Sequence, residues 1–380
     1  MSDAPTTTRQ IQSLVTAEGT VRAQLVDVAL PPPGDDEVVV AVEAAPINPS
    51  DLGLLFAVAD LTTLRAAGTD THPALEADIP EGLRGAVASR VGQALPVGNE
   101  GAGTVVAAGG GPAAQALLGR TVALLGGSMY AGHRVAPVSA LLPMPDGTAA
   151  RDAASCFVNP LTALGMVETM RLDGHSALVH TAAASNLGQM LNRICLADGV
   201  ELVNIVRRPE QEALLRDQGA RYVVDTSADG WQQALVSALV ATGATVAFDA
   251  IGGGRQAGHI LTAMESAINA RSGPAAFNRY GSAVHKQVYV YGGLDRGPTE
   301  FNCGFGMAWG IGGWLLTNFL NRVGPEVAAR LRQRVVDELH TTFASSYTAE
   351  VSLAGMLQLD AARQYSRQAT GTKYLVLPQA

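Results

Sequence analysis

Short apolar runs alternate with helical patterns through the chain from about residue 150 onward. Five runs have the length and residue types of buried strands: residues 177–181, 201–206, 222–224, 245–250 and 287–291. The segment between the first two runs carries apolar side chains at helical spacing: Leu187, Met190, Leu191 and Ile194. Gly199 stands where this helix should end, and Pro209 and Gly219 bracket a second one. Strands separated by helices pair in parallel, so the pattern predicts a doubly wound α/β sheet.

The part of the chain before residue 150 has a different pattern. Runs rich in β-branched residues at 38–42, 104–108 and 121–125 are bounded by glycine and proline, which predicts a partly closed β-barrel. Residues 57–93 contain Ala, Thr and charged side chains and lack Tyr and Trp, so we expect an excursion from the barrel, helical in part, with a substrate-covering lid as one role. The late strand pattern at 373–377 needs a partner, and the N-terminal β domain is the expected one.

Composition excludes several classes of function. The chain of 380 residues has a net charge of −8, which argues against a basic nucleic-acid interface or a polybasic membrane patch. Three distant cysteines exclude a disulfide scaffold and favour a reduced, cytoplasmic compartment. The N-terminus lacks the apolar core of a signal peptide. Residues 301–321 are uncharged but contain five glycines, so we interpret them as a packed segment or subunit contact rather than a membrane span.

A turn of small residues between a strand and a helix is the strongest binding motif. Residues 181–188 (TAAASNLG) occupy the place where a dinucleotide fold holds a pyrophosphate against backbone N–H groups. Most of the usual glycines are absent, but small side chains still permit close approach. Ser185 or Asn186 can cap the helix, and Ala184 and Leu187 complete the expected contact set. An ordinary strand–helix turn without a ligand is the alternative interpretation.

The end of the next strand predicts which coenzyme binds. An NAD site carries an acidic residue there, whereas this chain has Arg207 and Arg208. Two guanidinium groups suit a 2′-phosphate, so NADPH is the expected cofactor. A solvated arginine pair in a surface loop is the alternative.

Further glycines follow two later strands. Ile251 and Gly252 come after one strand, and Gly292, Gly293 and Leu294 come after another. Ligands of open α/β sheets bind beyond the carboxyl ends of the strands, so we expect these five residues near the nicotinamide. Sharp turns alone would also explain the glycines.

Four motifs in order make the chain recognisable as a member of a known superfamily. They are Asn48-Pro49-Ser50-Asp51, residues 98–103 (GNEGAG), Asn159-Pro160-Leu161-Thr162-Ala163 and the turn at 181–188. Together they resemble the medium-chain dehydrogenases/reductases, in particular the zinc-independent quinone oxidoreductases and the trans-2-enoyl-thioester reductases. The resemblance implies a GroES-like catalytic domain of residues 1–150 and 322–380 and a Rossmann domain of residues 151–321. It also implies a homodimer.

The resemblance assigns roles to particular residues. Asn48 and Thr162 match positions near the nicotinamide. Zinc enzymes of the superfamily have Cys and His where this chain has Asn48 and Asn99, so we expect no metal. The thioester reductases carry a catalytic tyrosine soon after the first motif, whereas the first tyrosine here is Tyr130. Tyr130 is therefore the candidate proton donor, and Tyr280 is both a second candidate and a possible cofactor contact.

The expected activity is NADPH-dependent hydride transfer to a quinone or a small α,β-unsaturated carbonyl. Reduction of a 2-enoyl thioester is the alternative reaction. A non-catalytic NADPH-binding redox sensor or structural protein is the alternative from another class.

Overall fold

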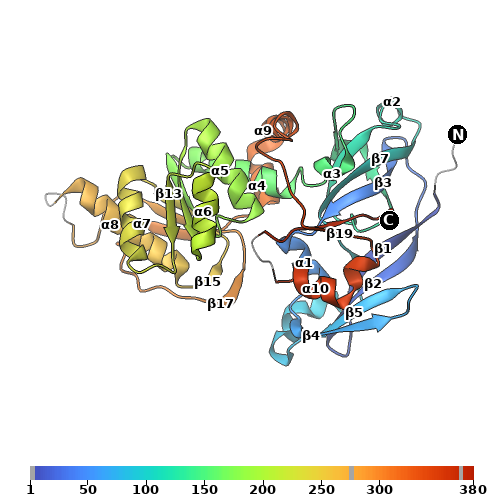
Figure 1. Cartoon of the computed structure of the whole chain (residues 1–380), viewed down its shortest axis with the longest axis horizontal. Helices are drawn as coiled ribbons and strands as arrows, with labels where there is room; N and C mark the ends of the chain where they lie inside the picture. The colour runs from blue at the N-terminus through green and yellow to red at the C-terminus, as the bar shows by residue number, and fades with distance from the viewer. Residues whose placement is uncertain (1–4, 274–277, 368–370) are drawn as a thin grey trace. The chain divides into compact units, whose positions relative to one another are not determined.

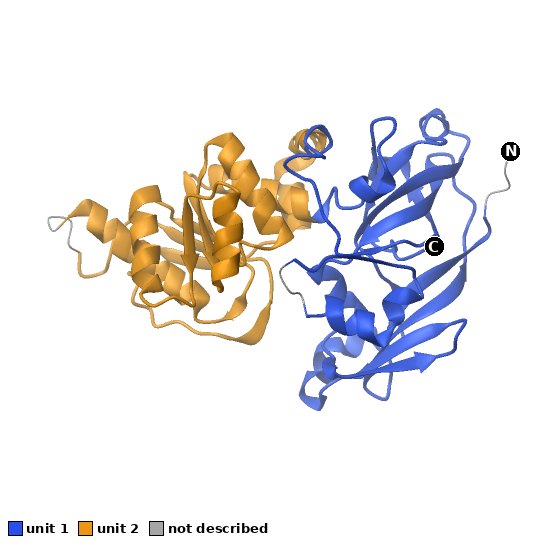
Figure 2. Cartoon of the chain, viewed as in Figure 1, with its two compact units in different colours: residues 1–158, 335–380 blue, residues 159–334 orange. Residues whose placement is uncertain are grey.

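Two compact units make up the chain. The computed structural model describes residues 5–273, 278–367 and 371–380. Unit 1 contains residues 1–158 and 335–380, and unit 2 contains residues 159–334 (Figure 2). Both divisions fall later in the chain than the expected 150 and 321: one is at the start of α4 (Val158–Leu172) and the other is near the end of α9 (Leu316–Asp337).

Unit 2 is a parallel sheet flanked by helices (Figure 1). The strand order is β13-β12-β11-β14-β16-β18, so the order reverses between β11 and β14. A core of aliphatic side chains and Phe305 joins the sheet to α7 and α8. Besides α4 and α9 the elements are β11 (Ala177–His180), α5 (Asn186–Asp198), β12 (Glu201–Val206), α6 (Pro209–Asp217), β13 (Tyr222–Asp225), α7 (Trp231–Thr242), β14 (Val246–Asp249), β15 (Gly252–Gly254), α8 (Gln256–Ser272), β16 (Lys286–Val290), β17 (Asp295–Thr299) and β18 (Trp309–Gly313).

Local sequence signals explain the helices of unit 2. Ser185 caps α5, and Gly199 ends it in the left-handed conformation at φ 66°. Pro209 is the first residue of α6, where its missing N–H costs nothing. The doubly wound sheet predicted from the sequence is confirmed, with β12 at the predicted residues.

The uncharged segment 301–321 forms the edge strand β18 and the start of α9. Ile311 and Leu315 are 37% and 58% exposed there. Among the described strands, β18 pairs with β16 alone. No helix in the described ranges combines the length and the apolar character needed to span a bilayer.

Unit 1 contains two larger sheets with an extensive aliphatic core. Their orders are β4-β5-β2-β1-β6 and β10-β8-β7-β3-β20-β19, and β9 also pairs with β3. The expected late strand is β20, which pairs antiparallel with β3 through Leu375↔Pro46. The elements are β1 (Thr7–Val15), β2 (Thr20–Ala29), β3 (Glu37–Pro46), α1 (Pro49–Leu55), β4 (Asp60–Gly68), β5 (Pro73–Asp78), η1 (Glu81–Arg90), β6 (Ala94–Pro96), β7 (Glu100–Ala108), α2 (Pro112–Gln115), β8 (Thr121–Leu125), β9 (His133–Pro137), η2 (Val138–Ala140), β10 (Leu141–Pro143), α3 (Ala150–Ala153), β19 (Ala349–Val351), η4 (Gly355–Leu357), α10 (Leu359–Tyr365) and β20 (Tyr374–Val376).

The segment 57–93 is helical in part, as expected, but it is not an excursion from the sheet. It is a hairpin, β4 and β5, that extends the first sheet, followed by the 3₁₀ segment η1. Arg65 bonds Asp78 across the hairpin at 2.9 Å, and β5 pairs with β2 along five residues. The segment is thus a part of the sheet, because its Thr and Ala residues suit a half-exposed strand as well as a helix.

Candidate functional site

The turn after β11 in unit 2 brings its backbone very close to α5. The Ser185 hydroxyl accepts a hydrogen bond from the Gly188 amide at 3.1 Å, and Ser185 is therefore the cap that the sequence left open between Ser185 and Asn186. A Cβ on Gly188 would lie 2.2 Å from the Ala183 carbonyl oxygen. Glycine is thus required at this position, and Ala182 itself adopts φ +50°. Ala184 and Leu187 are buried beside this cap.

A buried carboxylate joins this turn to the loop after β14. Asp249 accepts a hydrogen bond from the Thr181 hydroxyl at 2.7 Å and others from the Ile251 and Gly252 amides at 3.0 and 3.1 Å. The Thr181 hydroxyl in turn accepts from the Ala250 amide at 2.8 Å. The loops that follow β11 and β14, on either side of the reversal in strand order, are therefore held as one rigid edge.

Arg207 and Arg208 lie exposed directly after β12, at the same carboxyl edge of the sheet. Neither guanidinium takes part in an ion pair with the described residues. The Arg207 amide donates to the Gln211 side chain at 3.1 Å, and Arg208 directly precedes α6. Two cationic groups are thus available to an anion at this edge.

Backbone packing accounts for two of the glycines expected near a ligand. A Cβ on Gly252 would lie 2.8 Å from the Gly292 carbonyl oxygen, and one on Gly292 would lie 2.6 Å from that of Ala250. Gly293 has open space around it, and Leu294 is 48% exposed. Of this group, Gly293 and Leu294 are the residues that leave room for a bound molecule.

One other predicted residue, Tyr280, lies outside this edge. Tyr280 is 58% exposed and precedes β16, so it lies toward the opposite, amino edge of the parallel sheet. Next to it, Ser282 and Lys286 bind the Glu265 carboxylate at 2.7 Å each. The structure therefore does not bring Tyr280 to the expected cofactor edge, because a residue before a parallel strand cannot share the edge formed by residues after it. Thr162 is buried in α4 at 7% exposure.

Unit 1 contributes a buried amide and carboxylate pair. The Asn48 side-chain amide donates to Glu100 at 2.8 Å, and the other Glu100 oxygen accepts from the Phe157 and Val158 amides at 2.8 Å each. Burial raises the pKa of Glu100, and nearby Lys373 opposes that rise. The Asn48 carbonyl oxygen Oδ1 is buried and has no hydrogen-bond partner among the described residues. It is therefore an acceptor held ready for an outside donor.

A second buried carboxylate, Asp51, fixes the backbone around Asn48. Asp51 accepts from the Asn48 and Asn99 amides at 2.9 and 2.8 Å. Burial raises its pKa from 3.8 to about 7, although these hydrogen bonds favour the charged form.

Tyr130 is fully buried beside this carboxylate. Its hydroxyl donates to the Pro46 carbonyl at 3.1 Å, and burial raises its pKa well above the ordinary value. The expectation of Tyr130 as proton donor therefore meets a physical obstacle, because its only hydrogen is bonded inside the core. Its aromatic ring is a packing element of unit 1.

Known proteins of two kinds are similar to the chain in fold or in sequence. No family model matches it. The fold is similar to that of a candidate NADPH:quinone reductase from Mesorhizobium loti, with a TM-score of 0.72 and 25% identity across 99% of this chain and 100% of that one. The chain is 30% identical over 224 residues to a mitochondrial enoyl-[acyl-carrier-protein] reductase of Xenopus tropicalis, covering 53% of this chain and 51% of that protein. It is 28% identical over 159 residues to a quinone oxidoreductase of Pseudomonas aeruginosa, covering 41% and 49%.

These matches agree with the motifs and with the two-unit fold. In sequence and fold the chain is similar to quinone oxidoreductases and enoyl reductases of the medium-chain dehydrogenase/reductase superfamily. Its alignments span about half the length of the curated relatives. The GroES-like and Rossmann architecture expected of this superfamily is confirmed.

At the two positions where the sequence comparison places zinc ligands in the zinc enzymes, this chain has amide side chains. Asn48 binds Glu100, and the Asn99 side chain donates to the Ser50 hydroxyl at 3.0 Å. Across the described ranges, no group of three or more His, Cys, Asp or Glu residues could hold a metal ion.

Sequence reasoning missed the buried acids that organise both units. Asp51 and Glu100 stood inside motifs used for the resemblance, and Asp249 stood inside a predicted strand, yet none was assigned a role. For Asp249 the available signal was an acidic residue inside an otherwise apolar run, because buried carboxylates require hydrogen-bond donors. Asp51 and Glu100 lie in polar, small-residue motifs that carry no such signal.

Proposed function

We propose that the chain is an oxidoreductase that uses NADPH to reduce a quinone or a small α,β-unsaturated carbonyl compound. The observation that carries this proposal is the full-length similarity to an NADPH:quinone reductase, together with a rigid carboxyl edge that presents two free arginines. The quinone oxidoreductase relative supports the same substrate class.

The residues present fit this coenzyme. Arg207 and Arg208 would bind the 2′-phosphate, and the small-residue turn capped by Ser185 would let backbone amides approach the pyrophosphate. The unpartnered Asn48 oxygen would accept a hydrogen bond from a donor on the ligand. When bound, NADPH would supply a hydride, that is, a proton together with two electrons.

This chain's own part in the reaction is orientation and charge stabilisation. Glu100 fixes the amide plane of Asn48, because the donated hydrogen bond at 2.8 Å leaves Oδ1 pointing away from the carboxylate. Asp249 holds the edge loops of unit 2 in place before any ligand arrives. Preorganised polar groups of this kind lower the barrier without reorganising during the reaction.

Enoyl-thioester reduction is the second candidate, supported by the 30% identity to a mitochondrial enoyl reductase. The absence of any tyrosine before Tyr130 weighs against the mechanism of that branch. A redox sensor that binds NADPH without turnover is the remaining alternative.

The test is a turnover assay with the purified chain, in which the loss of NADPH absorbance is measured. Benzoquinones, small enones and a 2-enoyl thioester are compared as acceptors, and NADH replaces NADPH in a parallel series. Turnover of quinone or enone with preference for NADPH supports the proposal. Turnover confined to the thioester favours the second candidate, and tight NADPH binding without turnover favours the sensor.

We propose further that the protein acts as a homodimer in a reducing, cytoplasmic compartment. The free edge of β18 and the exposed side chains Ile311 and Leu315 support the dimer. Three free cysteines, two of them buried, support the compartment.

A further inference from the structure

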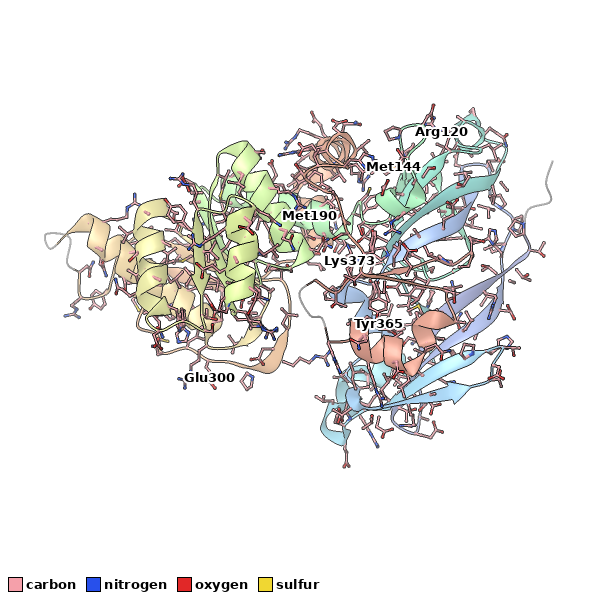
Figure 3. The ribbon with its side chains drawn as sticks, in the orientation of Figure 1. Arg120, Met144, Met190, Glu300, Tyr365 and Lys373 are labelled. Atoms are coloured by element: carbon pink, nitrogen blue, oxygen red, sulfur yellow. The ribbon has the colours of Figure 1, made fainter. Side chains whose placement is uncertain are left out.

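A hydrogen-bonded chain of three side chains in unit 1 ends at a partly exposed phenol. The Lys373 ammonium donates to the Ser155 hydroxyl at 2.8 Å, and that hydroxyl lies 2.8 Å from the hydroxyl of Tyr347. Lys373, which is labelled in Figure 3, directly precedes β20 in sequence. Ser155 is two residues before Phe157, whose amide donates to Glu100, the partner of Asn48. The segment 155–157 therefore contacts both the hydrogen-bonded series and the Asn48–Glu100 pair.

The donors and acceptors give this chain a direction. An ammonium group can only donate, so Ser155 accepts from Lys373. Ser155 is 2% exposed, and its own hydrogen needs an acceptor inside the protein, which Tyr347 supplies. With Ser155 donating, the hydrogen of Tyr347 is left for an outside acceptor. The order of donation is therefore from Lys373 through Ser155 to Tyr347.

The pKa values of the two end groups, Lys373 and Tyr347, favour the movement of a proton along this hydrogen-bonded series. Burial lowers the pKa of Lys373 from 10.5 to about 8, and Glu100 and Asp51 oppose that effect. Burial raises the pKa of Tyr347, so a free tyrosinate is disfavoured and its proton must be replaced as it leaves.

Other charged and titratable groups face Tyr347 itself. Arg151, which pairs with Glu350, and Lys373 lie over the Tyr347 ring at 5.6 and 5.3 Å from its centre. Glu100 and the buried Cys156 thiol also act on the phenol. Arg151, Glu350, Glu100 and Cys156 are present in all the variants below, and Lys373→Arg keeps a positive charge at position 373.

We propose that Lys373, Ser155 and Tyr347 form the proton relay that completes reduction of an α,β-unsaturated carbonyl acceptor. This inference rests on the proposed function. Hydride adds to the β-carbon, and the C=C electron pair moves to give an enolate. The enolate α-carbon takes the Tyr347 proton, Tyr347 takes that of Ser155, and Ser155 takes one from Lys373. Lys373 is left as a neutral amine, which solvent water reprotonates.

The basic residues of the sequence make the relay unusually easy to measure. Of 26 Lys and Arg residues only Lys286 and Lys373 are lysines. Arginine cannot release its proton, so Lys373→Arg keeps the positive charge but cannot serve as the proton source. Lys286 is in unit 2, where it is fully buried and paired with Glu265, and serves as an internal reference.

The first experiment uses the chain without coenzyme. Lysine labelled with carbon-13 at the ε-position gives two signals, which Lys373→Arg assigns. We expect the Lys373 signal to titrate near pH 8 and to shift in Ser155→Ala. A Lys373 that titrates at the ordinary value of about 10.4 overturns the relay.

The second experiment compares enone and quinone turnover in Tyr347→Phe, Ser155→Ala and Lys373→Arg. We expect each to lower kcat for the enone about 100-fold. The quinone rate should change less than about threefold, because solvent can protonate a quinol oxygen. The fall in the wild-type enone rate above about pH 8 should disappear in Lys373→Arg. Tyr365→Phe is the matched control, since Tyr365 bonds only the Met356 carbonyl among the described residues.

The outcomes separate the relay from the function on which it rests. A wild-type chain that turns over neither acceptor overturns the proposed function and the relay with it. An active wild type whose Tyr347→Phe and Lys373→Arg variants match Tyr365→Phe overturns the relay alone. Equal losses for enone and quinone also overturn it, because they indicate a merely structural role. Unfolding temperatures and NADPH affinities of all variants identify any that fail to fold.

Discussion

Burial of the Asp51 carboxyl makes the stability of the folded chain depend on pH. Replacing Asp51 by Asn should remove this dependence. The Asp51 carboxyl is 1% exposed, and its pKa is about 7 in the folded chain. The ordinary pKa of an Asp carboxyl, which applies to the unfolded chain, is 3.8. Above pH 3.8 the unfolded chain releases this proton while the folded chain retains it, so stability falls as pH rises. The loss is complete above about pH 7. At 1.36 kcal/mol per tenfold change in proton affinity, it amounts to about 4 kcal/mol.

The assay is urea unfolding of the wild type and of Asp51→Asn at a series of pH values, with circular dichroism as the signal. All three tryptophans are in unit 2, so their fluorescence cannot replace it. We expect the free energy of unfolding of Asp51→Asn to gain about 4 kcal/mol relative to wild type between about pH 4 and 7. The exposed Asp70→Asn is the control. Parallel curves for wild type and Asp51→Asn would refute the reasoning.

Three further predictions concern the edge of unit 2 and the core of unit 1. Replacing Arg207 and Arg208 together by Ala should weaken NADPH binding about 100-fold and NADH binding less than about threefold, as measured by calorimetry; equal losses would remove the 2′-phosphate assignment. Gly188→Ala places a Cβ 2.2 Å from a backbone oxygen. It should lower the free energy of unfolding by about 2 kcal/mol, measured by thermal unfolding, and abolish NADPH binding. Gly85→Ala, whose Cβ meets open space, should change neither property. Tyr130→Phe should cost about 1 kcal/mol of stability through the lost hydrogen bond and leave the enone-to-quinone rate ratio unchanged; a selective loss of enone reduction would restore Tyr130 as the donor.

The parallel sheet could be predicted because its signals are local. The apolar run of β12, the proline that starts α6 and the glycine that ends α5 each act within a few residues. The late strand β20 was predicted for another reason, because a lone strand needs a partner. The segment 57–93 was harder to assign, since alanine and threonine there satisfy either a helix or a half-exposed hairpin.

The candidate site was predictable only in part, because it depends on contacts between distant residues. Asn48 and Glu100 are separated by 52 positions and Lys373 and Ser155 by 218. No periodicity links such pairs. Tyr130 illustrates the opposite error, since a residue at a strand end can face the core rather than solvent, and here it bonds a carbonyl 84 positions away.

The place of β20 in its sheet has a consequence for biosynthesis. Ala45 and Pro46 of β3 pair with Val376 and Leu375, so part of the β3 edge stays open until residues 375 and 376 have been synthesised. Unit 2 is continuous in sequence, and its strands can all assemble while the chain is still attached to the ribosome. The nascent protein therefore carries a finished Rossmann sheet beside an unsealed barrel. Truncation of the final ten residues should yield aggregates through that edge rather than a smaller native protein.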